Sequence, residues 1–68
     1  DNEKIKQHFK KATELDAKDQ FAFLLYGAHL FKLGDYKEAL EVLKKAEALK
    51  PNFSAANKYY IGASLKYL

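Results

Sequence analysis

Apolar residues along the chain fall into four stretches separated by three polar breaks. The breaks are LDAKDQ at 15–20, LGDY at 33–36 and LKPNFS at 49–54. Each stretch has about 15 residues, which is a usual helix length. None of them shows the strict alternation of a strand, and Ile and Val together occur only three times. The pattern therefore predicts four helices, near residues 2–15, 20–33, 36–50 and 54–67.

Residues with capping chemistry stand at the predicted helix ends. Asp19 is placed to cap the second helix and Asp35 the third, each by accepting a hydrogen bond from a free backbone N–H. Glu38, three residues after Asp35, completes a capping-box arrangement. Gly34 is placed to end the second helix in the left-handed conformation, and Pro51 cannot continue the third. The two central helices are therefore expected to begin and end at these residues.

The second predicted helix, QFAFLLYGAHLFKL, is apolar on two sides. One stripe consists of Phe23, Tyr26, Gly27 and Leu30, and the other of Phe21, Leu24 or Leu25, Ala28 and Phe31. A surface helix has one apolar stripe, so two stripes indicate packing on both sides, or packing on one side and a ligand on the other. The third helix has one stripe that we expect to point inward: Tyr36, Ala39, Leu40, Leu43, Ala46 and Leu49. Its other face is expected to meet water: Lys37, Glu41, Lys44 and Glu47.

The chain also repeats itself. FKKATEL at 9–15 corresponds to LKKAEAL at 43–49 with a shift of 34, and YGAHLFKL at 26–33 corresponds to IGASLKYL at 61–68 with a shift of 35. The first helix is therefore a copy of the third, and the fourth is a copy of the second. A fixed period of this length indicates stacked copies of one structural unit. In the first helix we expect the lysines to face water and Phe9, Ala12 and Leu15 to pack inward.

This period and its residues resemble the tetratricopeptide repeat, a unit of 34 residues built from two helices. The matching positions are Phe23, Tyr26, Gly27 and Leu30, then Gly34, Asp35 and Tyr36 in the turn, then Ala39, Leu43, Ala46 and Pro51. Ala17 and Lys58 depart from the pattern, since the family carries proline and an aromatic residue there. The resemblance implies an all-α fold of antiparallel helix–turn–helix repeats stacked as a short right-handed superhelix. It implies one full repeat at about 20–53 between two in-phase half-repeats, so that residues 1–68 form a single unit, which we expect to be part of a longer array.

The net charge of +3 raises the question of nucleic-acid binding. All twelve basic residues are Lys, whereas Arg is the residue suited to bidentate recognition of phosphates and bases. The lysines alternate with acidic residues at helical spacing, which is typical of solvated helix faces. An RNA-binding helical repeat is an alternative, but it would need basic and polar residues where the second helix has Phe, Leu and Ala. We therefore expect no nucleic-acid partner.

No catalytic constellation is visible in the sequence. Cysteine is absent, which excludes disulfides and cysteine-based catalysis or metal binding. His8 and His29, the only imidazoles, lie on different predicted helices without metal-ligand spacing. We therefore expect a non-enzymatic protein without a cofactor or a metal. The sequence shows no targeting signal and no apolar run that could span a bilayer, so we expect a soluble protein, assigned to the cytoplasm only by default.

The resemblance implies a scaffold for protein–protein recognition, because in this family the first helices of the repeats line a concave groove that takes up a peptide or helix. Carried over to this chain, the groove positions are Phe21, Leu24, Ala28, Phe31, Lys32, Ala56, Tyr59, Ala63 and Lys66. Some members bind a C-terminal carboxylate through a polar clamp, whose positions here hold Leu24, Leu25, Ala28 and Tyr60. We therefore expect an apolar, aromatic groove with lysines at its edge, suited to a hydrophobic or amphipathic partner segment of some acidic character.

The alternative is that the same apolar face has no ligand of its own. Phe21, Leu24 and Phe31 would then be covered by a further repeat or by a second copy of the chain, as in a homodimer. The fourth helix favours such cover, because it is apolar around its circumference and a terminal helix of a repeat array needs a polar outer face. Groove binding predicts a monomer with an exposed patch, and self-association predicts a concentration-dependent dimer.

Overall fold

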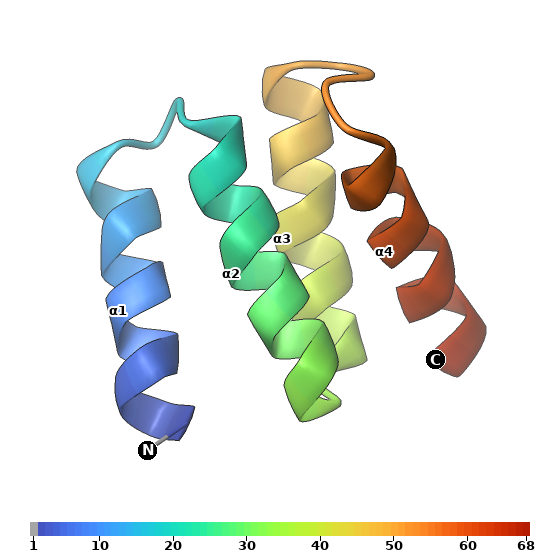
Figure 1. Ribbon diagram of the computed structural model, residues 1–68, viewed down its shortest axis with the longest axis horizontal. Helices are drawn as coiled ribbons and strands as arrows, with labels where there is room; N and C mark the ends of the chain where they lie inside the picture. The colour runs from blue at the N-terminus through green and yellow to red at the C-terminus, as the bar shows by residue number, and fades with distance from the viewer. Residues whose placement is uncertain (1) are drawn as a thin grey trace.

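The structure, a computed structural model, describes residues 2–68 as four α-helices. Helix α1 spans Asn2–Leu15, α2 Gln20–Leu33, α3 Tyr36–Leu49 and α4 Ala55–Tyr67. Successive helices run antiparallel and lie side by side, so both ends of the chain lie at the same end of the molecule (Figure 1). Each helix packs against the next, and α2 also contacts α4. The all-α helix–turn–helix arrangement predicted from the period is thus confirmed.

Helix α2 begins and ends at the residues predicted to cap it. One carboxylate oxygen of Asp19, Oδ1, accepts hydrogen bonds from the backbone N–H groups of Phe21 at 2.9 Å and Ala22 at 3.4 Å. At the other end, Gly34 has a φ of 86°, in the left-handed region that glycine tolerates. The N–H of Asp35 then reaches back to the Leu30 carbonyl at 2.9 Å, which satisfies a carbonyl in the last turn.

The predicted capping box at the start of α3 is wrong. Asp35 stands at the N-cap position, but its side chain makes no capping hydrogen bond. Its carboxylate lies 3.8 Å from the Lys6 ammonium, and a Glu38 carboxylate oxygen lies 3.3 Å from the same nitrogen. The second Glu38 oxygen accepts a hydrogen bond from the Tyr26 hydroxyl at 3.0 Å. The two carboxylates are therefore engaged by partners from other helices, which the local sequence does not indicate.

The core lies between α2 and α3. Its fully buried apolar side chains include Leu30 of α2 and Leu43 of α3, and Tyr26 is 4% exposed. A Cβ placed on Gly27 would lie 2.5 Å from both Cγ and Cδ2 of Leu43. Only a glycine allows this approach of the two helices. The buried set also contains Val42, which the single inward stripe predicted for α3 had omitted.

Three residues lie in other surroundings than the sequence predicted. Leu15 is 79% exposed and Leu49 is 40% exposed, although both were expected to pack inward. Each is the last residue of its helix, where the chain turns away and the neighbouring helix covers it less. Glu47 was expected to face water, but it is half-buried and accepts a hydrogen bond from the Asn52 backbone N–H at 2.6 Å. That hydrogen bond lowers the pKa of the Glu47 carboxyl.

Helix α4 packs on α3 through polar side chains. Asn57 and Ser64 are both fully buried. The Asn57 amide nitrogen donates to the Leu43 carbonyl at 3.1 Å and to Glu47 Oε1 at 3.2 Å. The apolar side chains of α4 include exposed ones, such as Leu65 at 54%. The helix is thus held on α3 by hydrogen bonds as well as by apolar and aromatic contacts, and it leaves part of its apolar surface uncovered.

Candidate protein-binding surface

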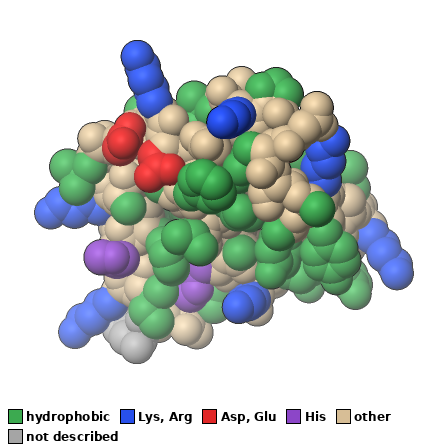
Figure 2. Space-filling model, turned by 45° about the horizontal axis from the view of Figure 1, so that its top comes forward, with side chains coloured by type: hydrophobic (Ala, Val, Ile, Leu, Met, Phe, Trp, Pro, Cys, Tyr) green, Lys and Arg blue, Asp and Glu red, His purple; other side chains and the backbone are tan. Residues whose placement is uncertain are grey.

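Helices α2 and α4 hold all nine positions that the resemblance assigned to a groove. Both helices have almost no amphipathic character, because each carries apolar residues on more than one side. In Figure 2, hydrophobic side chains gather over the part of the molecule formed by α2 and α4, and Lys side chains stand around them. The nine residues are therefore brought onto two neighbouring helices that touch each other.

The predicted residues differ in exposure. Phe21 is 54% exposed and Tyr59 66% exposed, so each offers a large apolar side chain to solvent. Ala56 is also exposed, and four of the predicted residues are half-buried: Leu24, Ala28, Phe31 and Ala63. The Phe21 ring is held edge-on against Phe53 of the α3–α4 loop, with ring centroids 5.3 Å apart. Phe21 and Tyr59 are therefore the predicted residues most available to a partner.

An aromatic cluster at one end of this surface was not predicted. Phe31 of α2 contacts Tyr36 and Tyr60, each with ring centroids 5.3 Å apart. Tyr67 of α4 stacks on Tyr36 at 5.0 Å and lies 6.1 Å from Phe31. The spacing of seven residues between Tyr60 and Tyr67 places both on one side of α4 and was the available signal. Because Phe31 lies beneath these tyrosines, it supports the surface more than it forms it.

Lysines provide the charge of this region. Lys32 and Lys66 are exposed, and each lies in the last turn of its helix. Neither forms an ion pair within the described part of the chain, 2–68. Their ammonium groups are therefore available to carboxylates of a partner.

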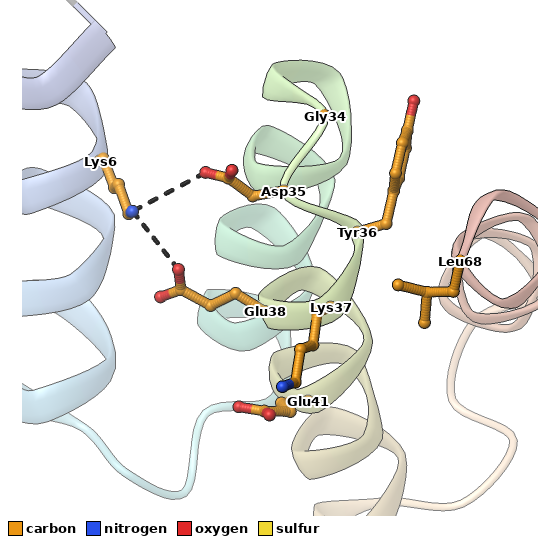
Figure 3. Close-up of a pocket in the computed structure, with 8 residues that line it drawn as sticks. All are labelled: Lys6, Gly34, Asp35, Tyr36, Lys37, Glu38, Glu41 and Leu68. Carbon is orange, nitrogen blue, oxygen red and sulfur yellow. Dashed lines mark ion pairs between the residues drawn. The ribbon is translucent and has the colours of Figure 1, made fainter.

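A separate polar cavity of about 620 Å³ lies where α2 passes into α3 (Figure 3). Lys6 of α1 reaches across to Asp35 and Glu38 at this site, and Leu68, which follows α4, lies on the opposite side. The hydrogen bond and the charge of Glu38 raise the pKa of the Lys6 ammonium, which therefore stays charged. Burial, followed by the hydrogen bond to Glu38, raises the pKa of Tyr26 to about 12. These contacts link α1, α2 and α3.

The two imidazoles come from different helices, His8 from α1 and His29 from α2. His29 is half-buried and its ring packs on Phe9, with centroids 5.5 Å apart, while His8 is exposed. Within residues 2–68, no three His, Asp or Glu side chains are grouped so that they could hold a metal ion. The helices of the same residues are all too short or too polar to cross a membrane.

The fold and this surface define a helical-repeat protein. The family model of the tetratricopeptide repeat matches residues 22–53, so this segment is a tetratricopeptide repeat. The match contains the α2–α3 pair with the turn between them. No curated protein and no solved structure matches the chain significantly. Repeats of this family generally mediate protein–protein interaction and are typically non-enzymatic scaffolds.

Proposed function

We propose that the chain is an interaction scaffold in which α2 and α4 bind a hydrophobic or amphipathic segment of a partner protein. The observation that carries this proposal is the exposure of large apolar side chains on two adjacent helices: Phe21, Leu25 and Tyr59 are each more than half exposed. Exposed aromatic residues that are held by neighbours can bind at low entropic cost, because their rings are already ordered. Such a surface suits a peptide that inserts apolar anchors.

The charge at the edge of the surface defines the partner further. Lys32 and Lys66 are exposed cations without ion-pair partners in residues 2–68, and the chain has a net charge of +3. Acidic residues flanking the apolar anchors of a partner would increase the association rate and fix its orientation. The proposed ligand is therefore an amphipathic segment with apolar anchors and acidic flanks.

A peptide-display selection on the immobilised chain tests this proposal. We expect the selected peptides to combine apolar or aromatic anchors with acidic residues. Phe21→Ser and Tyr59→Ser should each lower the affinity for the selected peptides about tenfold or more, which corresponds to a loss of about 1.4 kcal/mol or more of binding free energy at 25 °C. The matched control is Leu15→Ser, at an apolar residue that is 79% exposed outside the surface. Selection of no peptide, or equal loss in the control, would refute the proposal.

Self-association through the same surface is the second candidate, favoured by the same exposed residues. It predicts a dimer whose population rises with concentration and that Phe21→Ser disrupts. Sedimentation across a concentration range distinguishes it from peptide binding. The RNA-binding alternative predicts salt-dependent binding of single-stranded RNA, and we expect none because Phe, Leu and Ala occupy the face of α2.

A further inference from the structure

Within residues 2–68, the internal repeat leaves one helix pairing unmade. Helix α4 corresponds to α2 and α1 corresponds to α3, with shifts of 35 and 34 residues. Within the chain α2 and α3 pack directly on each other, but α1 and α4 do not touch. They lie on opposite sides of the molecule (Figure 1). The two sides of the α2–α3 interface therefore have equivalents on α4 and on α1, and these two faces do not meet within residues 2–68.

The face on α4 has the shape of the α2 side of that interface. Gly62 corresponds to Gly27, whose added Cβ would meet Leu43; around Gly62 nothing lies within 4 Å. Leu65 corresponds to Leu30, which is fully buried, yet Leu65 is 54% exposed. This face of α4 thus has a glycine for close helix approach beside an uncovered leucine.

The face on α1 has the pattern of the α3 side. Ile5 corresponds to Ala39, which is fully buried, but Ile5 is 43% exposed. Phe9 corresponds to Leu43 and is half-buried, because one side of its ring packs against the core and on His29 of α2. The apolar positions of α3 that contact α2 are therefore repeated on α1, where no helix of residues 2–68 covers them from the equivalent side.

We propose that α1 of a second copy of this chain docks on α4 and reproduces the α2–α3 pairing between molecules. Because the two faces are different and lie on opposite sides, each copy can accept one neighbour on α4 and offer α1 to another. Such a head-to-tail contact is heterologous and extends into an open assembly rather than closing as a dimer. The contact uses a different face from the peptide surface at Phe21 and Tyr59.

Side-chain sizes at the equivalent positions compensate for one another. On α1, Ile5 and Phe9 are larger than the residues they replace. On α4, Ile61 is smaller than its equivalent, Tyr26, and packs in part against the core of its own chain. In the proposed contact, Ile61 takes the place of Tyr26 and Lys4 takes the place of Glu38. Neither partner of the Tyr26–Glu38 hydrogen bond is therefore present without the other.

Charges at the edge of the proposed contact are also complementary. Within the chain, Phe23 of α2 and Ala48 of α3 line the same apolar cavity of about 290 Å³. Their equivalents are Lys58 on α4 and Glu14 on α1, and both are exposed. In the proposed contact, Lys58 of one copy therefore faces Glu14 of the next. This pairing is the reason for choosing a second copy as the occupant over an unrelated helix.

Sedimentation velocity of the 68-residue chain tests the proposal. We expect the mean mass to rise continuously with concentration, beyond that of a dimer. Leu65→Lys blocks the α4 face and Ile5→Lys blocks the α1 face, and each alone should lower the association constant at least about tenfold, because each would bury an unpaired charge. Mixed in equal amounts, the two variants should form a dimer and nothing larger, because one retains α1 and the other retains α4.

Three results would overturn the proposal: a monomer at every concentration, a mass that saturates at a dimer, or a mixture of the two variants that stays monomeric. Helical circular dichroism of each variant verifies folding, which is expected because both residues are largely exposed. Tyr59→Ser is the control that should weaken peptide binding and leave assembly unchanged, so the two proposals fail independently. Glu14→Lys should weaken assembly about two- to fivefold, and adding Lys58→Glu should restore it.

Discussion

Helices α2 and α4 carry glycine and leucine at corresponding positions, yet these residues have opposite surroundings. Gly27 and Leu30 are buried where α2 packs on α3, whereas Gly62 and Leu65 face solvent. Helix α2 has a neighbour on both sides, and α4 packs on α3 and touches α2 only at its edge. The comparison teaches that equivalent residues of a repeat can have different roles. Whether such a residue stabilises the fold or forms part of the surface depends on which helices lie next to its own helix. Substitutions at matched positions measure that difference.

The largest contrast is expected at the two leucines. Leu30→Ala should destabilise the fold by about 2–5 kcal/mol, because it opens a cavity among fully buried side chains. A chain of 68 residues has a total stability of about 3–10 kcal/mol, so this loss is a large fraction of the total. Leu65→Ala should change stability by less than about 0.5 kcal/mol. Urea unfolding at low protein concentration measures both, and equal losses would contradict the comparison.

The two glycines should respond with opposite signs. Gly27→Ala places a methyl group 2.5 Å from Leu43, which cannot move because it is fully buried, so the net loss should be about 1–2 kcal/mol. Gly62→Ala meets no neighbour and should raise stability by about 0.5–1 kcal/mol through helix propensity. Thermal melting followed by circular dichroism compares them. A stabilised Gly27→Ala would show that α2 and α3 do not approach as closely as described.

The polar side of α4 can be separated into a part that stabilises and a part that does not. Asn57→Ala removes hydrogen bonds to Leu43 and Glu47 in a buried site and should cost about 1–2 kcal/mol. The Ser64 hydroxyl is buried without a hydrogen-bond partner in residues 2–68, so Ser64→Ala should be neutral or slightly stabilising. The denaturant midpoints of Asn57→Ala and Ser64→Ala, each compared with that of the parent chain, measure the two effects. A larger loss for Ser64→Ala than for Asn57→Ala would be inconsistent with these contacts.

The last contrast is expected from pH. Tyr26 titrates at about 12 in the folded protein, above its ordinary value of 10.0, because burial and then the Glu38 hydrogen bond favour the protonated form. The folded chain therefore holds this proton more tightly than the unfolded chain. Stability from this source is complete below pH 10 and falls as the pH rises from 10 to about 12.

Tyr26→Phe should reduce the fall of the free energy of unfolding between pH 10 and about 12, compared with the parent chain. Other tyrosines and the lysines titrate in both proteins, so the difference between the two curves isolates Tyr26. At α4 the corresponding residue is Ile61, which has no proton to lose, and Ile61→Val therefore serves as the control. An unchanged slope in Tyr26→Phe would mean that the hydroxyl is not held by Glu38.

Local chemistry made several features predictable from the sequence. The polar breaks gave four helices, and Asp19 and Gly34 gave the ends of α2, because capping needs only neighbouring backbone groups. Phe21 and Tyr59 were placed on adjacent helices because a repeat returns equivalent positions to equivalent places. The aromatic cluster of Tyr36, Tyr60 and Tyr67 was missed because its rings come from different helices and meet only after packing.

The sequence by itself determined the helices, their order and the repeat that pairs α2 with α3. Those features depend on periodicity and on contacts within a few residues, which the chain specifies directly. Only the tertiary structure decided that Asp35 and Glu38 turn to Lys6 and Tyr26 instead of capping α3. It also decided that Leu30 is buried while its counterpart Leu65 is not. The physical reason is the same in both cases: partners and burial come from neighbouring helices, which local sequence does not reveal.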